Sequence, residues 1–281
     1  MEPYEVENNS IVCNIPMEDI KNTIKNESIV VHEIKHEKDE NEVSSQVSRI
    51  SLGGAQVGSL KKKLLVLDIN GVLADILFPP PSDIKGEYAM IMRAALFKRP
   101  FCLEFLKFCF EKFEVAIWSS GKKESVEQTI DYLMGDMKKK LLFYWDYSHC
   151  TKTTLGINLE ENKQKHLMFK DLSKIWENYD PNLPWEKGYY NESNTLLLDD
   201  SPYKAWLNPP HTSVFPHEFR YQNKSDNSLA IGGDLREYLD GLANSEDMAK
   251  YVEEHPFGQE GINEKSDSWY LYLNVIASNL F

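Results

Sequence analysis

Acidic residues follow two of the most apolar segments of this 281-residue chain. Asp68 comes directly after residues 64–67 (LLVL), and the pair Asp199 and Asp200 comes directly after residues 195–198 (TLLL). Such runs are typical of strands buried in a parallel sheet, whose carboxyl ends meet at one edge, where ligands bind. Asp also favours helix caps and turns, but its repetition after two strands favours a shared site. Clustered carboxylates repel one another unless a cation lies between them, so we expect Mg²⁺, which prefers oxygen ligands.

The elements that must position these acids follow from the spacing of apolar residues. Residues 101–113 (FCLEFLKFCFEKF) place apolar side chains three and four positions apart, which predicts a helix, and residues 122–135 predict a second one. Residues 114–121 (EVAIWSSG) and 141–147 (LLFYWDY) predict strands, and residues 232–258 predict two further helices. Strands that alternate with helices indicate an α/β fold, with a Rossmann-like parallel sheet and helices on both faces.

Charge and composition limit the possible partners. The net charge is −13, from 31 basic and 44 acidic residues, which would repel a phosphate backbone, so direct nucleic-acid binding is not expected. No stretch approaches 18 consecutive apolar residues, so no membrane span is expected. Residues 1–60 carry 5 Lys and Arg against 11 Asp and Glu, which predicts a disordered acidic arm before a folded domain over residues 61–281.

Four motifs occur in a specific order along the chain: LLVLDINGVL (64–73), KRPFCLEFLKFCFEKFEVAIWSS (98–120), FKDLSKIW (169–176) and LLLDDSP (196–202). This series resembles the haloacid dehalogenase superfamily, over about residues 61–251. Within it, the chain is similar to the phosphatases of the RNA polymerase II C-terminal domain, also called NLI-interacting-factor-like. The resemblance implies a magnesium-dependent phosphatase acting on phosphoserine or phosphothreonine of a protein partner. We expect a location in the nucleus or cytoplasm, and the acidic arm argues against a mitochondrial transit peptide, which should be rich in Arg and poor in acids.

The resemblance assigns catalytic roles to three residues. Asp68 matches the nucleophile that takes the phosphoryl group as an aspartyl phosphate, which splits one difficult displacement into two easier ones. Ser119 matches the hydroxyl residue that hydrogen-bonds the phosphoryl oxygens, although Ser120 is an equally good hydroxyl on spacing alone. Lys170 matches the lysine that neutralises charge on the nucleophile and the phosphate.

The resemblance also implies a ligand set for Mg²⁺. Asp68 and Asp200 match side-chain ligands, and Asp199 lies beside Asp200 in support or as an alternative ligand. Asn70 matches a residue that binds the metal through its backbone carbonyl, a contact that does not depend on the side chain.

Asn70 is the departure from the family pattern, which has an aspartate at this position. That aspartate serves as general acid to the leaving group and then as base toward water, and an amide does neither near neutral pH. Two alternatives follow. The protein is a phosphatase that finds a proton elsewhere, through Asp75 or a metal-bound water. Otherwise it is a non-catalytic interaction module, like the receptor subunit of the mitochondrial presequence translocase, although this chain shows neither the membrane span nor the N-terminus expected of that relative.

The length of the insertions bears on the size of the substrate. Residues 74–98, between the first and second motifs, number only 25, which predicts a small cap or none, and a site open to a protein side chain. Residues 176–194 (WENYDPNLPWEKGYYNESN) are rich in Trp, Tyr and Pro. They could line a groove for an extended phosphopeptide or simply pack as a loop.

Overall fold

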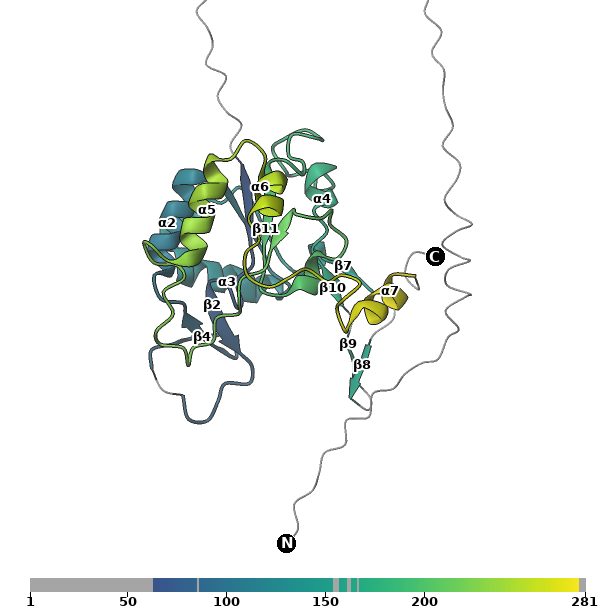
Figure 1. The fold of residues 1–281 in the computed structure, drawn as a ribbon. Coiled ribbons are helices and arrows are strands. Elements are labelled where there is room, and N and C mark those ends of the chain that lie inside the picture. The colour runs from purple at the N-terminus through teal and green to yellow at the C-terminus, as the bar shows by residue number, and fades with distance from the viewer. Residues whose placement is uncertain (1–62, 85, 154–156, 161–162, 166, 278–281) are drawn as a thin grey trace, which may run out of the picture. The chain divides into compact units, whose positions relative to one another are not determined.

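A five-stranded parallel sheet forms the centre of the fold, with strand order β12–β11–β1–β5–β6 (Figure 1). The computed structural model describes residues 63–84, 86–153, 157–160, 163–165 and 167–277, and the predicted acidic arm lies outside them. The strands of the sheet are β1 (Leu64–Leu67), β5 (Glu114–Trp118), β6 (Tyr144–Trp145), β11 (Thr195–Leu198) and β12 (Ser213–Val214). The strand order reverses at β1, and this confirms the predicted Rossmann-like α/β fold.

Helices cover the first face of the sheet, where Leu65 and Leu67 of β1 are fully buried. The helices of this face are α2 (Cys102–Lys112), α3 (Lys123–Met134), α5 (Asp234–Asn244) and α6 (Met248–Glu254). They agree with the helices expected from the apolar spacing. Because side chains alternate along a strand, a run that is apolar at every position must be covered on its other face as well.

A shorter set of elements covers the second face, where Leu64 and Val66 are buried. The one-turn helix α4 (Ser173–Trp176) packs there together with the aromatic segment that follows it. Trp185 and Tyr190 of that segment are buried against the sheet, and the Trp185 indole N–H donates to the Ile175 carbonyl at 3.2 Å. Leu183, Trp185 and Tyr190 therefore pack as core, whereas Tyr179 of the same segment is exposed, so the segment packs as a loop in part and a role in peptide binding stays a prediction.

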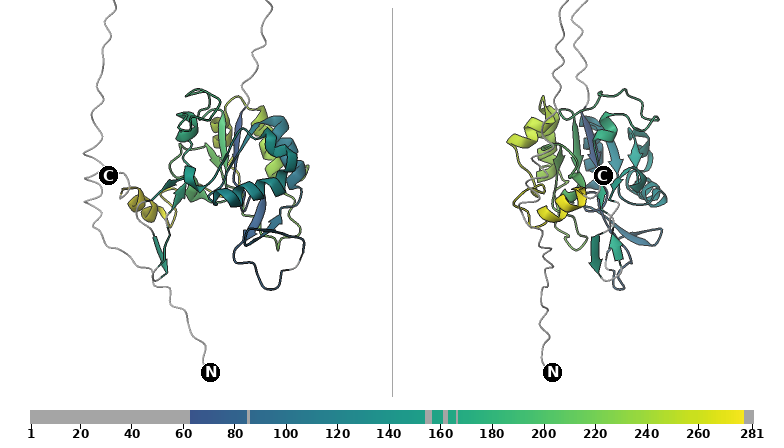
Figure 2. Two further views of the ribbon diagram at one scale, coloured as in Figure 1. Left: turned by 180° about the vertical axis from the view of Figure 1, so that it is seen from behind. Right: turned by 90° about the vertical axis from the view of Figure 1, so that its right-hand side faces the viewer.

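A small antiparallel sheet stands between the first and second motifs, in the order β2–β4–β3. Its strands are β2 (Ala74–Leu77), β3 (Ala89–Ile91) and β4 (Ala94–Lys98). Figure 2 shows it extending past the carboxyl ends of the parallel strands. Arg99 anchors its base, because its guanidinium pairs with Asp226 at 2.8 Å and donates to the Val72 carbonyl at 3.1 Å. This sheet is the small cap that the short insertion predicted.

The remaining elements are short strands, 3₁₀ helices and one helix that lie between α3 and the C-terminal end. The strands are β7 (Thr151–Lys152), β8 (Ile157–Glu160), β9 (Lys163–Lys165) and β10 (Met168–Phe169), the 3₁₀ helices are η1 (Gly135–Lys140), η2 (Tyr147–His149) and η3 (Pro202–Ala205), and the last helix is α7 (Trp269–Ala277). Helix α7 packs on η3: the Tyr272 ring stacks on Tyr203 and Trp206, and Trp269 meets Trp206 edge-on. Among the described residues, no helix has the length and apolar character that crossing a membrane requires.

Candidate active site

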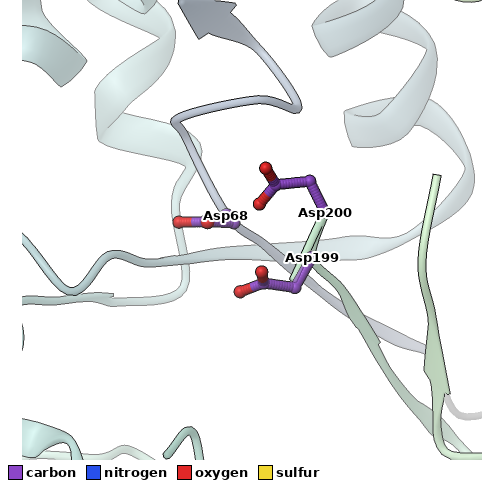
Figure 3. Close-up of side chains that lie close together, drawn as sticks. All are labelled: Asp68, Asp199 and Asp200. Atoms are coloured by element: carbon purple, nitrogen blue, oxygen red, sulfur yellow. The ribbon is translucent and has the colours of Figure 1, made fainter. Parts of the chain in front are cut away.

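The three acids converge where β1 and β11 end. Leu67 of β1 is in register with Leu198 of β11, so the residues that follow, Asp68 and Asp199, emerge side by side. The Asp68 backbone N–H extends the ladder by donating to the Leu198 carbonyl at 2.9 Å. Carboxylate oxygens of Asp68, Asp199 and Asp200 lie within 4.8 Å of one another, and Figure 3 shows the carboxylates turned toward the same side. Parallel strands thus place these acids together, as expected.

Lys170 lies at the centre of this cluster. It follows β10, its side chain is fully buried, and its ammonium contacts Asp68 Oδ1 at 3.0 Å and also pairs with Asp199. Asn208 holds the backbone here, because its side-chain amide donates to the Lys170 carbonyl at 2.9 Å. The structure therefore places Lys170 where the sequence predicted a lysine that neutralises the nucleophile.

A second lysine, which sequence reasoning missed, completes the cluster. Lys204 of η3 is buried, and its Nζ atom lies 2.7 Å from Asp68 Oδ2 and 3.0 Å from Asp199 Oδ1. The distance from Nζ to Asp200 Oδ1 is longer, at 3.8 Å. The sequence held one signal for it: Lys204 stands four residues after Asp200 with Pro202 opening a helical turn between them, a spacing at which opposite charges meet.

The two ammonium groups determine the ionisation of Asp68. Burial alone would raise the pKa of Asp68, but the charges of Lys170 and Lys204 outweigh burial and lower this pKa to about 2. For Lys204, burial favours the neutral amine, and the surrounding carboxylates prevail and raise its pKa well above the ordinary value. Asp68 is therefore an ionised carboxylate at every physiological pH.

Asp200 has the opposite electrostatic environment. Burial is the main cause that raises its pKa to about 7, and the carboxylates of Asp68, Asp199 and Glu218 add to this against the opposing charge of Lys204. Lys170 and Lys204 pair closely with Asp68 and Asp199, whereas the Lys204 ammonium lies 3.8 Å from Asp200, so Asp200 is the least compensated of the three acids. A cation beside Asp200 would therefore favour its ionised form.

A cavity of about 320 Å³ opens in front of Asp68. Its lining includes Ser119, Ser120 and Lys204. Ser119 is half-buried after β5, and its hydroxyl oxygen accepts the Gly121 backbone N–H at 3.1 Å, whereas Ser120 is exposed. Both serines line the cavity, and the hydroxyl of Ser119 is the one held by a described hydrogen bond.

Asn70 lines the same cavity but directs its amide oxygen to the backbone. Asn70 Oδ1 accepts the Ile76 N–H at 2.7 Å, which ties the turn after β1 to strand β2. Asp75 does not compensate: it is absent from the cavity lining, and its carboxylate accepts the Tyr221 backbone N–H at 2.9 Å. Of the residues that line the described part of this cavity, Asp68 is the one acid.

Gly71 and Gln259 shape the backbone around Asp200. Gly71 has φ of +80°, and a Cβ atom there would lie 2.2 Å from Asp200 Oδ2, so this turn requires glycine. The Gln259 side-chain amide donates to the Asp200 carbonyl at 2.7 Å and to the Pro216 carbonyl at 2.9 Å. These contacts fix Asp200 at the edge of the site.

A family model described as NLI interacting factor-like phosphatase matches residues 63–249, more than half of the chain. The chain belongs to this family. An FCP1 homology domain-containing protein of the fission yeast Schizosaccharomyces pombe is 25% identical over 198 residues, covering 70% of this chain and 78% of the relative. The ubiquitin-like domain-containing CTD phosphatase 1 of Drosophila melanogaster is 26% identical over 204 residues, covering 69% of this chain and 55%, about half, of the relative.

Among solved structures, one of Fcp1, an essential RNA polymerase II CTD phosphatase, aligns with a TM-score of 0.38 and 13% identity. The alignment covers 77% of this chain and 62% of that one. Membership of the family rests on the family model, and it confirms the resemblance to the phosphatase branch of the haloacid dehalogenase superfamily. A phosphatase-type function is thereby supported.

The donor set of this family member fits a divalent cation. Carboxylate oxygens are the ligands that Mg²⁺ prefers, and a cation beside Asp200, the least compensated of the three acids, would favour its ionised form. In the turn after β1, the carbonyls of Ile69, Gly71 and Ala74 accept backbone N–H groups. None of the hydrogen bonds that the structure describes has the Asn70 carbonyl as its acceptor. That oxygen is thus available for the role the family pattern gives it.

Replacing Asp200 by Asn is expected to stabilise the metal-free protein at high pH. The raised pKa means that folding favours protonated Asp200. The contribution of this protonation to the free energy of unfolding is therefore fully present below about pH 4 and is lost as the pH rises through about 7. In EDTA at pH 8, Asp200→Asn should therefore be up to about 4 kcal/mol more stable than wild type in urea unfolding, at 1.36 kcal/mol per pKa unit. The gain should disappear near pH 4.

Magnesium should reverse this ranking, because wild type gains stability from the cation and Asp200→Asn loses a ligand. Asp240→Asn is the matched control, since Asp240 forms an exposed ion pair with Lys112. A stability difference that does not change with pH, or an unchanged magnesium titration in Asp200→Asn, would refute the assignment of Asp200.

Proposed function

We propose that the protein is a magnesium-dependent phosphatase-like protein that accepts the phosphoryl group of phosphoserine or phosphothreonine in a protein partner. The observation that carries this proposal is the state of Asp68: a buried, permanently ionised carboxylate between two ammonium groups, beside an open cavity. A phosphoryl group that enters the cavity meets a nucleophile flanked by two ammonium groups, and a bound divalent cation would supply the further positive charge that phosphoryl transfer requires.

Each residue of the site has a defined part in this reaction. Asp68 attacks phosphorus and becomes an aspartyl phosphate while the serine or threonine oxygen leaves. Lys170 neutralises charge on Asp68 as the bond forms, and the Ser119 hydroxyl orients the phosphoryl oxygens. Mg²⁺, when bound, would supply Lewis-acid stabilisation of the charge on those oxygens. The residues that would hold it are Asp68, Asp199, Asp200 and the carbonyl of Asn70.

The proton transfers are the weak part of this site. An alkoxide leaves poorly without a proton, and water attacks the aspartyl phosphate slowly without a base. Asn70 supplies neither function, and Asp75 lies outside the cavity. We therefore propose that turnover is slow: departure of the serine or threonine oxygen limits it for a phosphoprotein, and hydrolysis of the aspartyl phosphate limits it for a substrate whose leaving group needs no proton.

The substrate class follows from the openness of the site and from the family. The three-stranded cap is small, and a cavity of about 320 Å³ holds a phosphorylated side chain but not a large metabolite. Relatives such as the fly protein are described as CTD phosphatases, which favours a phosphoprotein partner in the nucleus or cytoplasm.

A second candidate function is partner recognition without catalysis. Two observations favour it: Asn70 holds the loop backbone instead of facing a substrate proton, and both Asp68 oxygens are engaged by lysines. In this alternative the chain is an interaction module on a phosphatase fold.

Hydrolysis of an aryl phosphate separates these two candidates, because its leaving group departs without a proton. With Mg²⁺, the wild type should release the aryl alcohol in a burst close to one equivalent, followed by slow turnover. Asp68→Asn should abolish the burst, and Asp240→Asn, at an exposed ion pair with Lys112, should retain it. If wild type at high concentration gives no burst while binding magnesium, the protein is an interaction module.

A further inference from the structure

The Lys204 ammonium lies in the middle of the proposed magnesium ligands. It contacts Asp68 Oδ2 at 2.7 Å and Asp199 Oδ1 at 3.0 Å, and it approaches Asp200 Oδ1 to 3.8 Å. No other ammonium of the described residues pairs with all three acids. A positively charged group that contacts three convergent carboxylates does electrostatically what a bound cation would do.

Lys170 and Lys204 divide the oxygens of Asp68 between them. Lys170 pairs with Oδ1 and Lys204 with Oδ2, but only Lys204 also reaches both Asp199 and Asp200, so a cation held among these three acids would take the place of the Lys204 ammonium. Lys170 is the firmer of the two, because its side chain is fully buried and lies outside the cavity lining. Lys204 lines the cavity, which gives its ammonium a space to enter when it leaves the carboxylates.

Hydrogen bonds fix the backbone of Lys204, whereas its side chain has the cavity as a second position. Its N–H donates to the Ser201 carbonyl at 3.0 Å, and its carbonyl accepts the Lys170 N–H at 2.7 Å. On either side of it, Tyr203 and Trp206 stack on Tyr272 of helix α7. A change at this position is therefore confined to the flexible lysine side chain.

We propose that Lys204 is an internal competitor of Mg²⁺: its ammonium occupies the cation position of the metal-free site and must swing into the cavity before the metal binds Asp68 and Asp199. This inference rests on the proposed magnesium site and adds a regulatory property to it. In the metal-free site, the two lysines pair closely with Asp68 and Asp199 and so compensate these buried charges. The cost is a weaker affinity for magnesium, because each binding event breaks two charge-assisted hydrogen bonds.

The first test is calorimetric titration of MgCl₂ into wild type, Lys204→Met and Lys174→Met. Methionine keeps the apolar length of the side chain and removes its charge. Lys174→Met is the matched control, because Lys174 of α4 is a half-buried lysine whose ammonium donates to the His149 carbonyl of η2 and to none of the three acids. Lys204→Met should bind magnesium at least about 10-fold more tightly than wild type, the factor expected when even one of the two charge-assisted hydrogen bonds no longer has to be broken, and the control should not differ from wild type.

The second test uses wild type alone and does not depend on how the variant folds. An amine-acetylating reagent is applied with and without MgCl₂, and the labelled lysines are quantified by peptide mass spectrometry. Magnesium should increase the labelling of Lys204 severalfold, because its ammonium leaves the carboxylates for the open cavity, while labelling of Lys174 stays constant.

The outcomes separate this inference from the proposed function. If wild type binds magnesium, Lys204→Met binds it no more tightly, and Lys204 labelling does not change, the competition is wrong while the magnesium site stands. If neither protein binds magnesium, both proposals are wrong. Loss of magnesium binding in folded Lys204→Met would also overturn the inference, because Lys204 would then support the metal instead of opposing it.

Discussion

Asn70→Asp is expected to raise steady-state hydrolysis of a phosphoserine peptide by about 100- to 10,000-fold, the range that general acid–base catalysis supplies. The structure indicates that the change is tolerated, because one carboxylate oxygen can keep the hydrogen bond from the Ile76 N–H at 2.7 Å. The other oxygen replaces the amide nitrogen in a residue that lines the cavity beside Asp68. It can therefore protonate the leaving oxygen and afterwards activate water.

The choice of substrate sharpens this test. The gain should be larger for the phosphoserine peptide than for an aryl phosphate, because only the alkyl leaving group needs a proton, and the burst seen with the aryl phosphate should give way to linear release. Asn223→Asp is the control, since it adds the same charge at an exposed residue whose Oδ1 also accepts a hydrogen bond. If Asn70→Asp binds magnesium and remains as inactive as wild type, partner binding without catalysis is the better account.

Lys170→Met is expected to destabilise the metal-free protein by about 3–5 kcal/mol, the usual cost of removing one partner from a buried ion pair. Lys170 is fully buried between Asp68 and Asp199, which are themselves almost completely buried, so its loss leaves negative charge in the interior. Urea unfolding in EDTA at pH 7 measures the difference. Since the free energy of unfolding of a native domain is only about 5–15 kcal/mol, this loss should be a large fraction of it.

Lys138→Met provides the comparison for Lys170→Met. Lys138 pairs with Asp131 at 2.8 Å on the surface, and exposed pairs contribute less than about 1 kcal/mol. Magnesium should return part of the stability of Lys170→Met, because it replaces some of the missing positive charge. Equal effects of the two substitutions would show that the buried acids are protonated or hydrated, and the assigned electrostatics of the site would then be wrong.

The parallel sheet and the acids at its edge were predictable from the sequence because burial on both faces of a strand leaves a continuous apolar run. Residues 64–67 and 195–198 are such runs, and their register brings Asp68 beside Asp199. Helix α2 was equally clear, because one buried face repeats every three to four residues. The position of Lys170 came from family resemblance alone, since its neighbours show no pattern that would bury a lysine.

Lys204 and helix α7 could not be predicted on these grounds. A lysine is normally exposed, and only the tertiary arrangement of three acids makes its burial favourable. Helix α7 packs through stacked aromatic rings on η3, and such a contact depends on residues far apart in the sequence. The segment 176–194 shows why composition alone did not decide between a binding surface and loop packing: Trp185 and Tyr190 cover the second face of the sheet, whereas Tyr179 is exposed.

Gln259 and helix α7 both lie beyond residue 249, where the family match ends. A minimal domain cut at that boundary would keep every acid and both lysines. It would lose the amide that holds the Asp200 carbonyl, and it would expose the rings of Tyr203 and Trp206, between which Lys204 stands. Metal affinity and turnover measured on such a fragment would describe a loosened site, so enzymology on this protein needs its C-terminal residues in place.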